Sequence, residues 1–311
     1  MTEGNPHPHP LPRLRGSGSE SNTFSRAGEG VSGSVAITAL HSYPVKSCRG
    51  LSHAASVVRR TGLEWDRQWM FVTDTGRFIT QRESGALARV EVAIENASVV
   101  LRAAGHPELR CPIEETTPTM RVRIWRDVCA AQPSRVDTRD WLEAAAGIRG
   151  QLVRAAPGHD RISSAAFTGD DEGRVHFGDA YAFLLVGEAS LEDLNSRLPR
   201  KLPMARFRPN IVLRGLRPYA EDDIDRLVFG GIELKCVKPC TRCITTTTDQ
   251  VTGQRDGDEP LRTLQSYRRL ASLNGVAFGM NAILLNGDGR SLAVGDRAEV
   301  IWRRTDAPRP W

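Results

Sequence analysis

Three of the six cysteines in this 311-residue chain lie in one short stretch, which reads KCVKPCTRC over residues 235–243. Cysteine thiolates are soft metal ligands, and cations beside a thiol favour its deprotonated form. Two lysines and one arginine inside the stretch supply such cations. The cluster of Cys236, Cys240 and Cys243 therefore indicates metal or thiol chemistry.

Four interpretations of this cluster stay open on the residues alone. A zinc site needs further ligands at a suitable spacing, but no His or Cys follows Cys243. The Cys-x3-Cys-x2-Cys spacing also occurs in the iron–sulfur motif of radical S-adenosylmethionine enzymes, although that motif opens a long α/β barrel and strands are expected here. A dithiol pair at Cys240 and Cys243 would need a thioredoxin-like βαβ context. The fourth interpretation is a structural set of buried cysteines.

Charge and composition narrow the class of protein. The formal net charge of +5 and the pI near 9.0 suit an anionic ligand, but no basic run with interleaved aromatic residues predicts nucleic-acid binding. The longest apolar runs, such as residues 182–186, fall far short of the ~20 residues that span a bilayer. With no secretory signal and no disulfide framework expected, the sequence predicts a cytoplasmic protein that does not enter the membrane.

The segments that must position the cysteine cluster are mostly strands. In the first half, short runs rich in β-branched and aromatic residues are separated by turn residues, and a helix through Trp141, Leu142 and Ala145 is expected to start at Asp137 or Thr138. Gly147 is the expected end of that helix. The predicted strands of this half are residues 35–40, 55–59, 69–73, 77–81, 89–94, 98–102 and 120–125.

The second half repeats this strand-rich composition, with helices predicted over residues 190–198 and 264–269. Its predicted strands are residues 151–154, 181–186, 211–214, 227–229, 232–237, 244–248, 282–285 and 298–302. The predicted fold class is mainly β (α+β), with a β-barrel-like domain packed on a second β-barrel domain. The predicted domains are a disordered leader (1–34), an N-terminal domain (35–150), a second domain (151–305) and a tail (306–311).

Six stretches in a fixed order connect these elements to a known family. They are YPVKSC (43–48), DRQW (66–69), GEASL (187–191), RFRPNI (206–211), CTRC (240–243) and PLRTL (260–264). Together they make residues 36–303 resemble the MOSC family, in the branch that has an N-terminal MOSC β-barrel domain and includes the amidoxime-reducing components.

The resemblance implies a molybdenum cofactor and assigns its ligands. Cys243 matches the family's cysteine that binds molybdenum, so it is the predicted metal ligand and catalytic residue. The loop over residues 177–181 lacks the family's small hydroxyl side chains at Ala180 and Tyr181, which leaves its backbone for contacts. The residues that match the family's cofactor-binding positions are Lys46, Ser47, Arg67, Arg208, Asn210, Thr241 and Cys243.

The resemblance further implies an oxidoreductase that reduces N-hydroxylated or other N-oxygenated small molecules. No cysteine follows Cys243 that could hold an iron–sulfur cluster, so a separate electron-transfer protein is expected to supply electrons. The alternative is a molybdenum-cofactor carrier or sulfur-transfer protein without reductase activity. A fold of this family that serves only as an interaction module is a third hypothesis. Asp249 is the carboxylate nearest to Cys243 along the chain, and no residue is assigned as proton donor.

Overall fold

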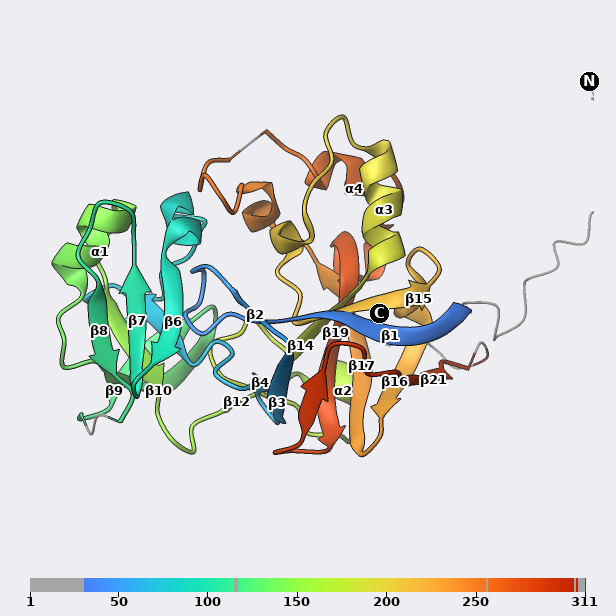
Figure 1. The fold of residues 1–311 in the computed structure, drawn as a ribbon, viewed down its shortest axis with the longest axis horizontal. Coiled ribbons are helices and arrows are strands. Elements are labelled where there is room, and N and C mark those ends of the chain that lie inside the picture. Colours follow the sequence, from blue (N-terminus) through green and yellow to red (C-terminus); the bar gives the residue numbers. More distant parts are fainter. Residues whose placement is uncertain (1–30, 115–116, 256, 305, 307–310) are drawn as a thin grey trace, which may run out of the picture.

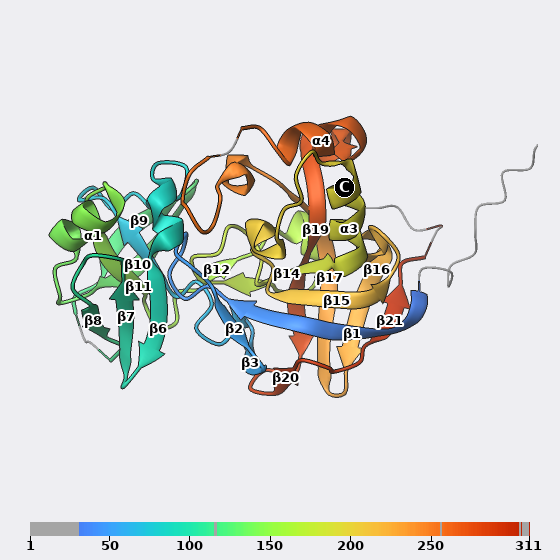
Figure 2. The same cartoon turned by 45° about the horizontal axis from the view of Figure 1, so that its top comes forward.

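The computed structural model describes residues 31–114, 117–255, 257–304, 306 and 311. Most of the described elements are strands, and they form two lobes that lie side by side (Figures 1 and 2). The mainly β fold class predicted from the sequence is confirmed. Strand β1 begins at Val31, so the last residues of the predicted leader are ordered, and the rest of that leader lies outside the described residues.

The larger lobe is built on one long sheet with the order β2-β1-β15-β14-β19-β17-β16-β21. All neighbours in it are antiparallel except β14 and β15, which run parallel. The strands are β1 (Val31–Ser42), β2 (Leu51–His53), β14 (Phe183–Gly187), β15 (Ile211–Leu216), β16 (Ile224–Phe229), β17 (Ile232–Thr241), β19 (Gly275–Asn286) and β21 (Glu299–Trp302).

Short strands extend this lobe at its edges. β18 (Arg269–Leu270) pairs with β19, and β3 pairs with both β4 and β20. A separate two-stranded ladder joins β12 to β13. These strands are β3 (Ala55–Arg59), β4 (Gly62–Leu63), β12 (Arg161–Ile162), β13 (Arg174–Val175) and β20 (Ser291–Ala293).

The smaller lobe, residues 69–155, contains two antiparallel sheets with the orders β5-β11-β10-β9 and β6-β7-β8. Its strands are β5 (Trp69–Val72), β6 (Glu91–Glu95), β7 (Ser98–Arg102), β8 (Leu109–Pro112), β9 (Met120–Ile124), β10 (Asp127–Pro133) and β11 (Gln151–Ala155). The two lobes do not follow the domain boundary expected at residue 150. Strands β1 to β4 precede that boundary but pair with strands of the larger lobe, whereas β11 follows it and pairs with β5 and β10.

Helices cover the edges of the sheets. The α-helices are α1 (Arg139–Ala146), α2 (Ala165–Thr168), α3 (Glu188–Arg197) and α4 (Leu261–Tyr267), and the 3₁₀ helices are η1 (Gly85–Arg89), η2 (Met204–Phe207), η3 (Ala220–Asp223), η4 (Ile244–Thr247) and η5 (Ala271–Leu273). α3 and α4 bury Leu194 and Leu264 in one apolar cluster with Phe207 and Phe278. Cys240 packs against this cluster, which holds the end of β17 in place.

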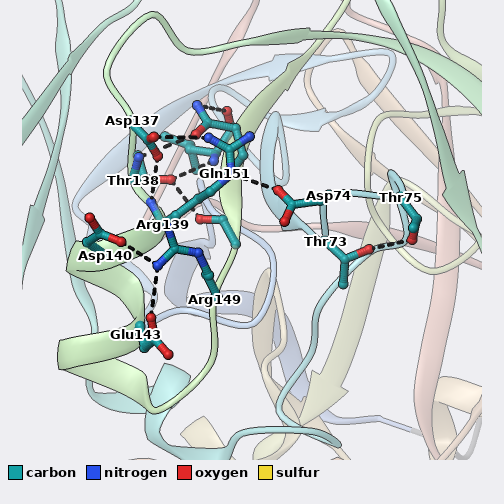
Figure 3. Close-up of polar contacts among 12 residues, drawn as sticks. Thr73, Asp74, Thr75, Asp137, Thr138, Arg139, Asp140, Glu143, Arg149 and Gln151 are labelled. Carbon is teal, nitrogen blue, oxygen red and sulfur yellow. Dashed lines mark hydrogen bonds and ion pairs between the residues drawn. The ribbon is translucent and has the colours of Figure 1, made fainter.

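The N-cap position of α1 is Thr138, one of the two predicted residues (Figure 3). The Asp137 carboxylate accepts a hydrogen bond from the backbone N–H of Arg139, at 3.0 Å, in the first turn. Thr138 makes no side-chain capping bond to the first turn. Its hydroxyl donates to the carbonyl of Gly150 at 2.9 Å and accepts from the N–H of Leu152 at 2.8 Å, so it joins α1 to β11.

Gly147 ends α1 as predicted. Its φ of 67° is the left-handed conformation that glycine adopts without steric cost, and its N–H donates to the Glu143 carbonyl at 2.8 Å. The other predicted elements have counterparts in the structure apart from two strands, although β19 begins seven residues before the predicted strand 282–285. Strands β8 and β10 were not predicted.

Two predicted strands are wrong, and hydroxyl side chains explain both. Residues 244–248 form η4 instead, because Thr246 and Thr247 donate their hydroxyl protons to carbonyls three residues earlier, each at 2.8 Å. Residues 77–81 make only isolated bridges. There Glu83 accepts both the backbone N–H and the hydroxyl of Thr80, at 3.0 and 2.6 Å, which closes a turn.

Candidate functional site

All of the predicted site residues line one cavity, which has a volume of about 150 Å³. The N-terminal part of the chain contributes Lys46, Ser47 and Arg67, and the second half contributes Arg208, Asn210, Thr241 and Cys243. The smaller lobe adds Thr80 and Arg82 to the same wall. The cavity therefore brings together segments that are far apart in the sequence.

The three clustered cysteines have different surroundings. Cys236 points into the core from β17, and burial raises the pKa of its thiol to about 12. Cys240 lies at the end of the same strand, where its sulfur accepts a hydrogen bond from Arg242 at 3.0 Å. Cys243 follows the strand, directly before η4, and lines the cavity together with Cys240. Cys236 is thus a structural residue.

The surroundings of Cys243 favour its thiolate. Burial alone raises the pKa of the thiol, but hydrogen bonds from the hydroxyl and backbone N–H of Thr245, together with the charge of Arg82, bring it below its usual value. Arg82 comes from the smaller lobe, so the electrostatics of this sulfur depend on both lobes. A partly buried thiolate of this kind is a good ligand for a soft, high-valent metal.

Lys46 is buried and held by the loop that precedes β14. Its Nζ donates to the Phe177 carbonyl at 2.9 Å and to Asp179 Oδ1 at 2.6 Å. Burial lowers the pKa of Lys46 despite its pairing with Asp179. For Asp179, burial opposes ionisation, but the charge and hydrogen bond of Lys46 outweigh it and hold the pKa of the carboxyl well below its usual range. Lys46 and Asp179 thus form an ion pair beside the cavity.

Arg67 and Arg208 both lie against the ring of Tyr43. Their guanidinium carbons are 4.3 and 4.1 Å from the ring centroid. Arg67 also donates to Asp66 Oδ2 at 2.6 Å and to Asn210 Oδ1 at 3.1 Å. Burial lowers the pKa of Arg208 to about 10. Two cations are thus fixed side by side at the wall of the cavity.

Asn210 is buried, and other parts of the protein already use its amide. The Oδ1 atom accepts hydrogen bonds from Arg67 and from the Leu184 N–H at 3.1 Å, and Nδ2 donates to the His41 carbonyl at 3.1 Å. Its geometry suits a residue that orients Arg67. Thr241, in contrast, is exposed at the end of β17.

Three of the predicted site residues have a strained backbone. Ser47, Arg67 and Arg208 have φ values of 71°, 48° and 55°, in the left-handed region that side chains other than glycine, asparagine and aspartate seldom adopt. Such conformations persist where the surrounding structure fixes them, and they concentrate at functional sites. The strain is consistent with a binding role for this wall of the cavity.

Sequence reasoning did not assign three further cations that line the cavity, which are Arg82, Arg206 and Arg242. Arg206 donates to the Thr247 carbonyl at 3.0 Å and to Asp249 Oδ2 at 3.1 Å. Arg206 and Arg242 stand inside the RFRPNI and CTRC stretches, so their positions were visible in the sequence. Their role depends on which way each side chain points, which the stretches do not reveal.

The carboxylate of Asp249 pairs with Arg206. Its carboxylate accepts backbone hydrogen bonds from Thr252 and Val251, each at 2.9 Å, as well as the bond from Arg206. The hydrogen bond of Thr252 is the main reason why the pKa of Asp249 lies below its usual value. Asp249 is therefore ionised at neutral pH and is better placed to orient Arg206 than to donate a proton.

The donor set around the cavity fits an anionic, metal-carrying cofactor. In the part of the chain that the structure describes, no group of three or more His, Cys, Asp or Glu residues could hold a metal, so zinc and iron–sulfur sites lack a ligand set. Within the same residues, the buried Nε atoms of Arg206 and Arg242 have no hydrogen-bond partner. Buried donors without partners are costly unless a ligand uses them. One thiolate beside several cations suits a cofactor that brings its own metal ligands and a phosphate.

Comparison with known proteins identifies the family. The profile of the MOSC N-terminal beta barrel domain matches residues 34–148, and that of the MOSC domain matches residues 172–299. Mouse (Mus musculus) mitochondrial amidoxime-reducing component 1 is 37% identical over 237 residues, which cover 73% of this chain and 69% of the mouse protein. This chain belongs to the MOSC family.

Two human relatives support the same assignment. Human (Homo sapiens) mitochondrial amidoxime-reducing component 1 is 35% identical over 73% of this MOSC chain and 70% of its own length. Human mitochondrial amidoxime reducing component 2 is 32% identical over 82% of this chain and 80% of its own length. Within the described residues of the MOSC protein, each helix is too short or too polar to pass through a bilayer.

Proposed function

We propose that this MOSC protein is a molybdenum-cofactor-dependent oxidoreductase that reduces N-hydroxylated or other N-oxygenated small molecules. The observation that carries the proposal is the placement of Cys243, whose thiolate is favoured inside a cavity lined by cations from both lobes. The names of the relatives, which describe amidoxime-reducing components, point to the same substrate class.

In this proposal the Cys243 sulfur is the protein's ligand to molybdenum. Lys46, Arg67 and Arg208 neutralise the phosphate of the pterin cofactor, since lysine offers a point charge and arginine offers paired donors. Ser47 and Thr241 add hydroxyl hydrogen bonds, and Asn210 acts through Arg67. Arg206 and Arg242, which line the same cavity, add positive charge beside the ligand.

When bound, the cofactor supplies the two-electron chemistry that removes an oxygen atom from nitrogen. The overall reaction consumes two electrons and two protons, breaks the N–O bond and releases water, so an amidoxime becomes an amidine. The electrons come from a separate electron-transfer protein in this proposal. The residues of the chain hold the cofactor, keep the thiolate ionised and exclude bulk water from the sulfur.

Two measurements on the purified protein test the function. Molybdenum and pterin are quantified first, and about one of each per chain is expected. The protein is then supplied with an amidoxime and with reduced methyl viologen as an artificial donor, and formation of the amidine is expected. Molybdenum without any amidine would point to a carrier or sulfur-transfer protein, and a metal-free protein would leave only an interaction module.

The cytoplasmic location expected from the sequence is also part of this proposal. The relatives named above are mitochondrial by name. Fractionation of cells that express the tagged full chain distinguishes these locations.

A further inference from the structure

The tip of the β9–β10 hairpin carries an aromatic side chain that the fold does not use as core. Trp125 is 43% exposed, and no other tryptophan in the described part of the chain is exposed. Its φ of 54° is a conformation in which a bulky residue is a genuine outlier and glycine is favoured. Glycine would adopt this turn conformation without strain, so the indole lowers the stability of the turn.

Contacts place this indole at the rim of the cavity. The guanidinium carbon of Arg82, which lines the cavity, lies 4.3 Å from the centroid of the Trp125 ring. Phe78 packs on the indole edge-on at 4.8 Å, and Lys46 Nζ, another cavity group, lies 5.7 Å from the Phe78 ring. The indole is therefore two contacts away from the proposed cofactor-binding wall.

Asp127, the first residue of β10, links the hairpin to the other side of the cavity. Asp127 accepts a hydrogen bond from Arg161 Nε at 2.8 Å, and Arg161 Nη1 donates to the Gly178 carbonyl at 2.6 Å. Gly178 belongs to the loop that lines the cavity beside Lys46. Arg161 thus connects the tip of the hairpin to a loop that lines the cavity.

In the part of the chain that the structure describes, the guanidinium group of Arg82 has N–H donors without partners beside the cavity. Among the described residues, its guanidinium forms neither a hydrogen bond nor an ion pair, and it lies against the Trp125 ring. A planar group that lies against the indole would therefore meet both an aromatic face and free N–H donors. Aromatic rings and conjugated N–O groups have this combination of a flat apolar part and acceptor atoms.

We propose that Trp125, supported by Arg82, is a specificity-determining residue that selects aromatic over aliphatic N-oxygenated substrates. This inference rests on the proposed function and deepens it. The indole adds affinity for the flat part of the substrate, and it takes no part in breaking the N–O bond.

The test uses the cofactor-loaded full chain, with benzamidoxime and acetamidoxime as an aromatic and an aliphatic substrate. Trp125→Gly is expected to raise KM for benzamidoxime about two- to tenfold, the range of one aromatic contact, while kcat, molybdenum content and KM for acetamidoxime stay unchanged. The φ of Trp125 suits glycine, so this variant keeps the turn. Trp125→Phe should retain most of the aromatic preference.

Val128→Ala is the matched control, because Val128 is an exposed apolar residue of the same hairpin, whereas Arg82 lies against the ring of Trp125. Equal changes in both KM values, no change for benzamidoxime, or the same effect from Val128→Ala would overturn the inference. Calorimetric binding of benzamidoxime provides a readout without turnover. One outcome separates the two proposals: the wild type binds benzamidoxime, Trp125→Gly weakens this binding, and neither protein reduces either substrate. That outcome supports the role of Trp125 in binding and contradicts the proposed reductase activity. If the wild type neither binds nor reduces benzamidoxime, both proposals are wrong.

Discussion

Arginines are used in opposite ways at α1 and at the cavity. At α1, Arg139 and Arg149 lie on the surface, and carboxylates surround both of them (Figure 3). Their partners are Asp74, Asp137, Asp140 and Glu143. At the cavity, Arg206 is 1% exposed, and its Nε–H and that of Arg242 have no partner within the described residues.

The difference lies in the donors that stay unused. Arg206 also pairs with a carboxylate, Asp249, but it is buried and, within the described residues, keeps one N–H group without a partner. Exposed ion pairs gain little, because water already solvates both groups and salt screens them. A buried donor without a partner is costly. The cavity arginines therefore weaken the empty protein, and their retention is explained if an anionic cofactor pairs with them.

The strongest test of this comparison is Cys243→Ser. The proposal explains the cavity cations by a metal cofactor, and Cys243 is its proposed metal ligand. A serine hydroxyl is harder than a thiolate and remains protonated, so molybdenum content should fall at least about tenfold. Mass spectrometric metal analysis of the purified variant measures this. Cys240→Ser is the matched control and should keep its metal. Equal molybdenum in the wild type and in Cys243→Ser would remove the central assignment.

The next largest effect is expected at Arg208. Arg208→Ala removes a buried cation from the cavity wall, and loss of a charge-assisted contact should lower bound pterin about tenfold or more. Arg208→Lys should restore only part of it, because lysine cannot donate two parallel bonds. Fluorescence of the released, oxidised pterin gives the occupancy. Arg102→Ala, a surface arginine paired with Glu95, should bind as much pterin as the wild type. A similar loss in both variants would break the comparison.

The same contrast shows what could be predicted from the sequence. Cys243 and the Lys46-Ser47 pair stand in short stretches with recognisable order, so the resemblance located the cavity wall. Arg82 belongs to none of those six stretches, and it approaches Cys243 only because the smaller lobe packs beside η4. A contact between lobes leaves no local pattern in either segment.

Two features of the fold escaped prediction for similar reasons. The β-branched run at residues 244–248 has strand propensity, but hydroxyl bonds from Thr246 and Thr247 to local carbonyls form η4. Strand β1 was predicted correctly as a strand, whereas its pairing with β15, far away in sequence, was not foreseen. Alternation of side chains predicts a strand without naming its neighbour.

Glu221 tests an intermediate case, a buried carboxyl group that accepts hydrogen bonds. It accepts bonds from the Gly187 N–H at 3.2 Å and the Ser190 hydroxyl at 2.8 Å. Burial, with the charge of Asp222 adding to it, raises its pKa from 4.5 to about 7. The folded state thus holds a proton that the unfolded state releases, so the contribution of Glu221 to stability is greatest below pH 4.5 and falls by about 3 kcal/mol as pH rises to 7.

Glu221→Gln should remove this loss, because the amide stays neutral throughout. Urea unfolding at a series of pH values measures the effect, and the wild type should lose stability relative to the variant between pH 4.5 and 7. A constant difference between the two proteins over that range would show that the buried carboxyl does not titrate there.

The smallest effect is expected at the surface. Arg149 donates to Glu143 at 3.0 Å and contacts Asp140, but its side chain is 48% exposed. Arg149→Ala should shift Tm by less than about 2 °C at low salt, and 1 M salt should abolish the difference because screening removes the attraction in the wild type as well. Thermal unfolding followed by circular dichroism at both salt concentrations measures this. A larger shift that survives high salt would mean that the pairs at α1 hold the smaller lobe together. Surface ion pairs would then be important for the stability of the fold. The contrast between the surface arginines and the cavity arginines would no longer distinguish weakly contributing charges from functional ones.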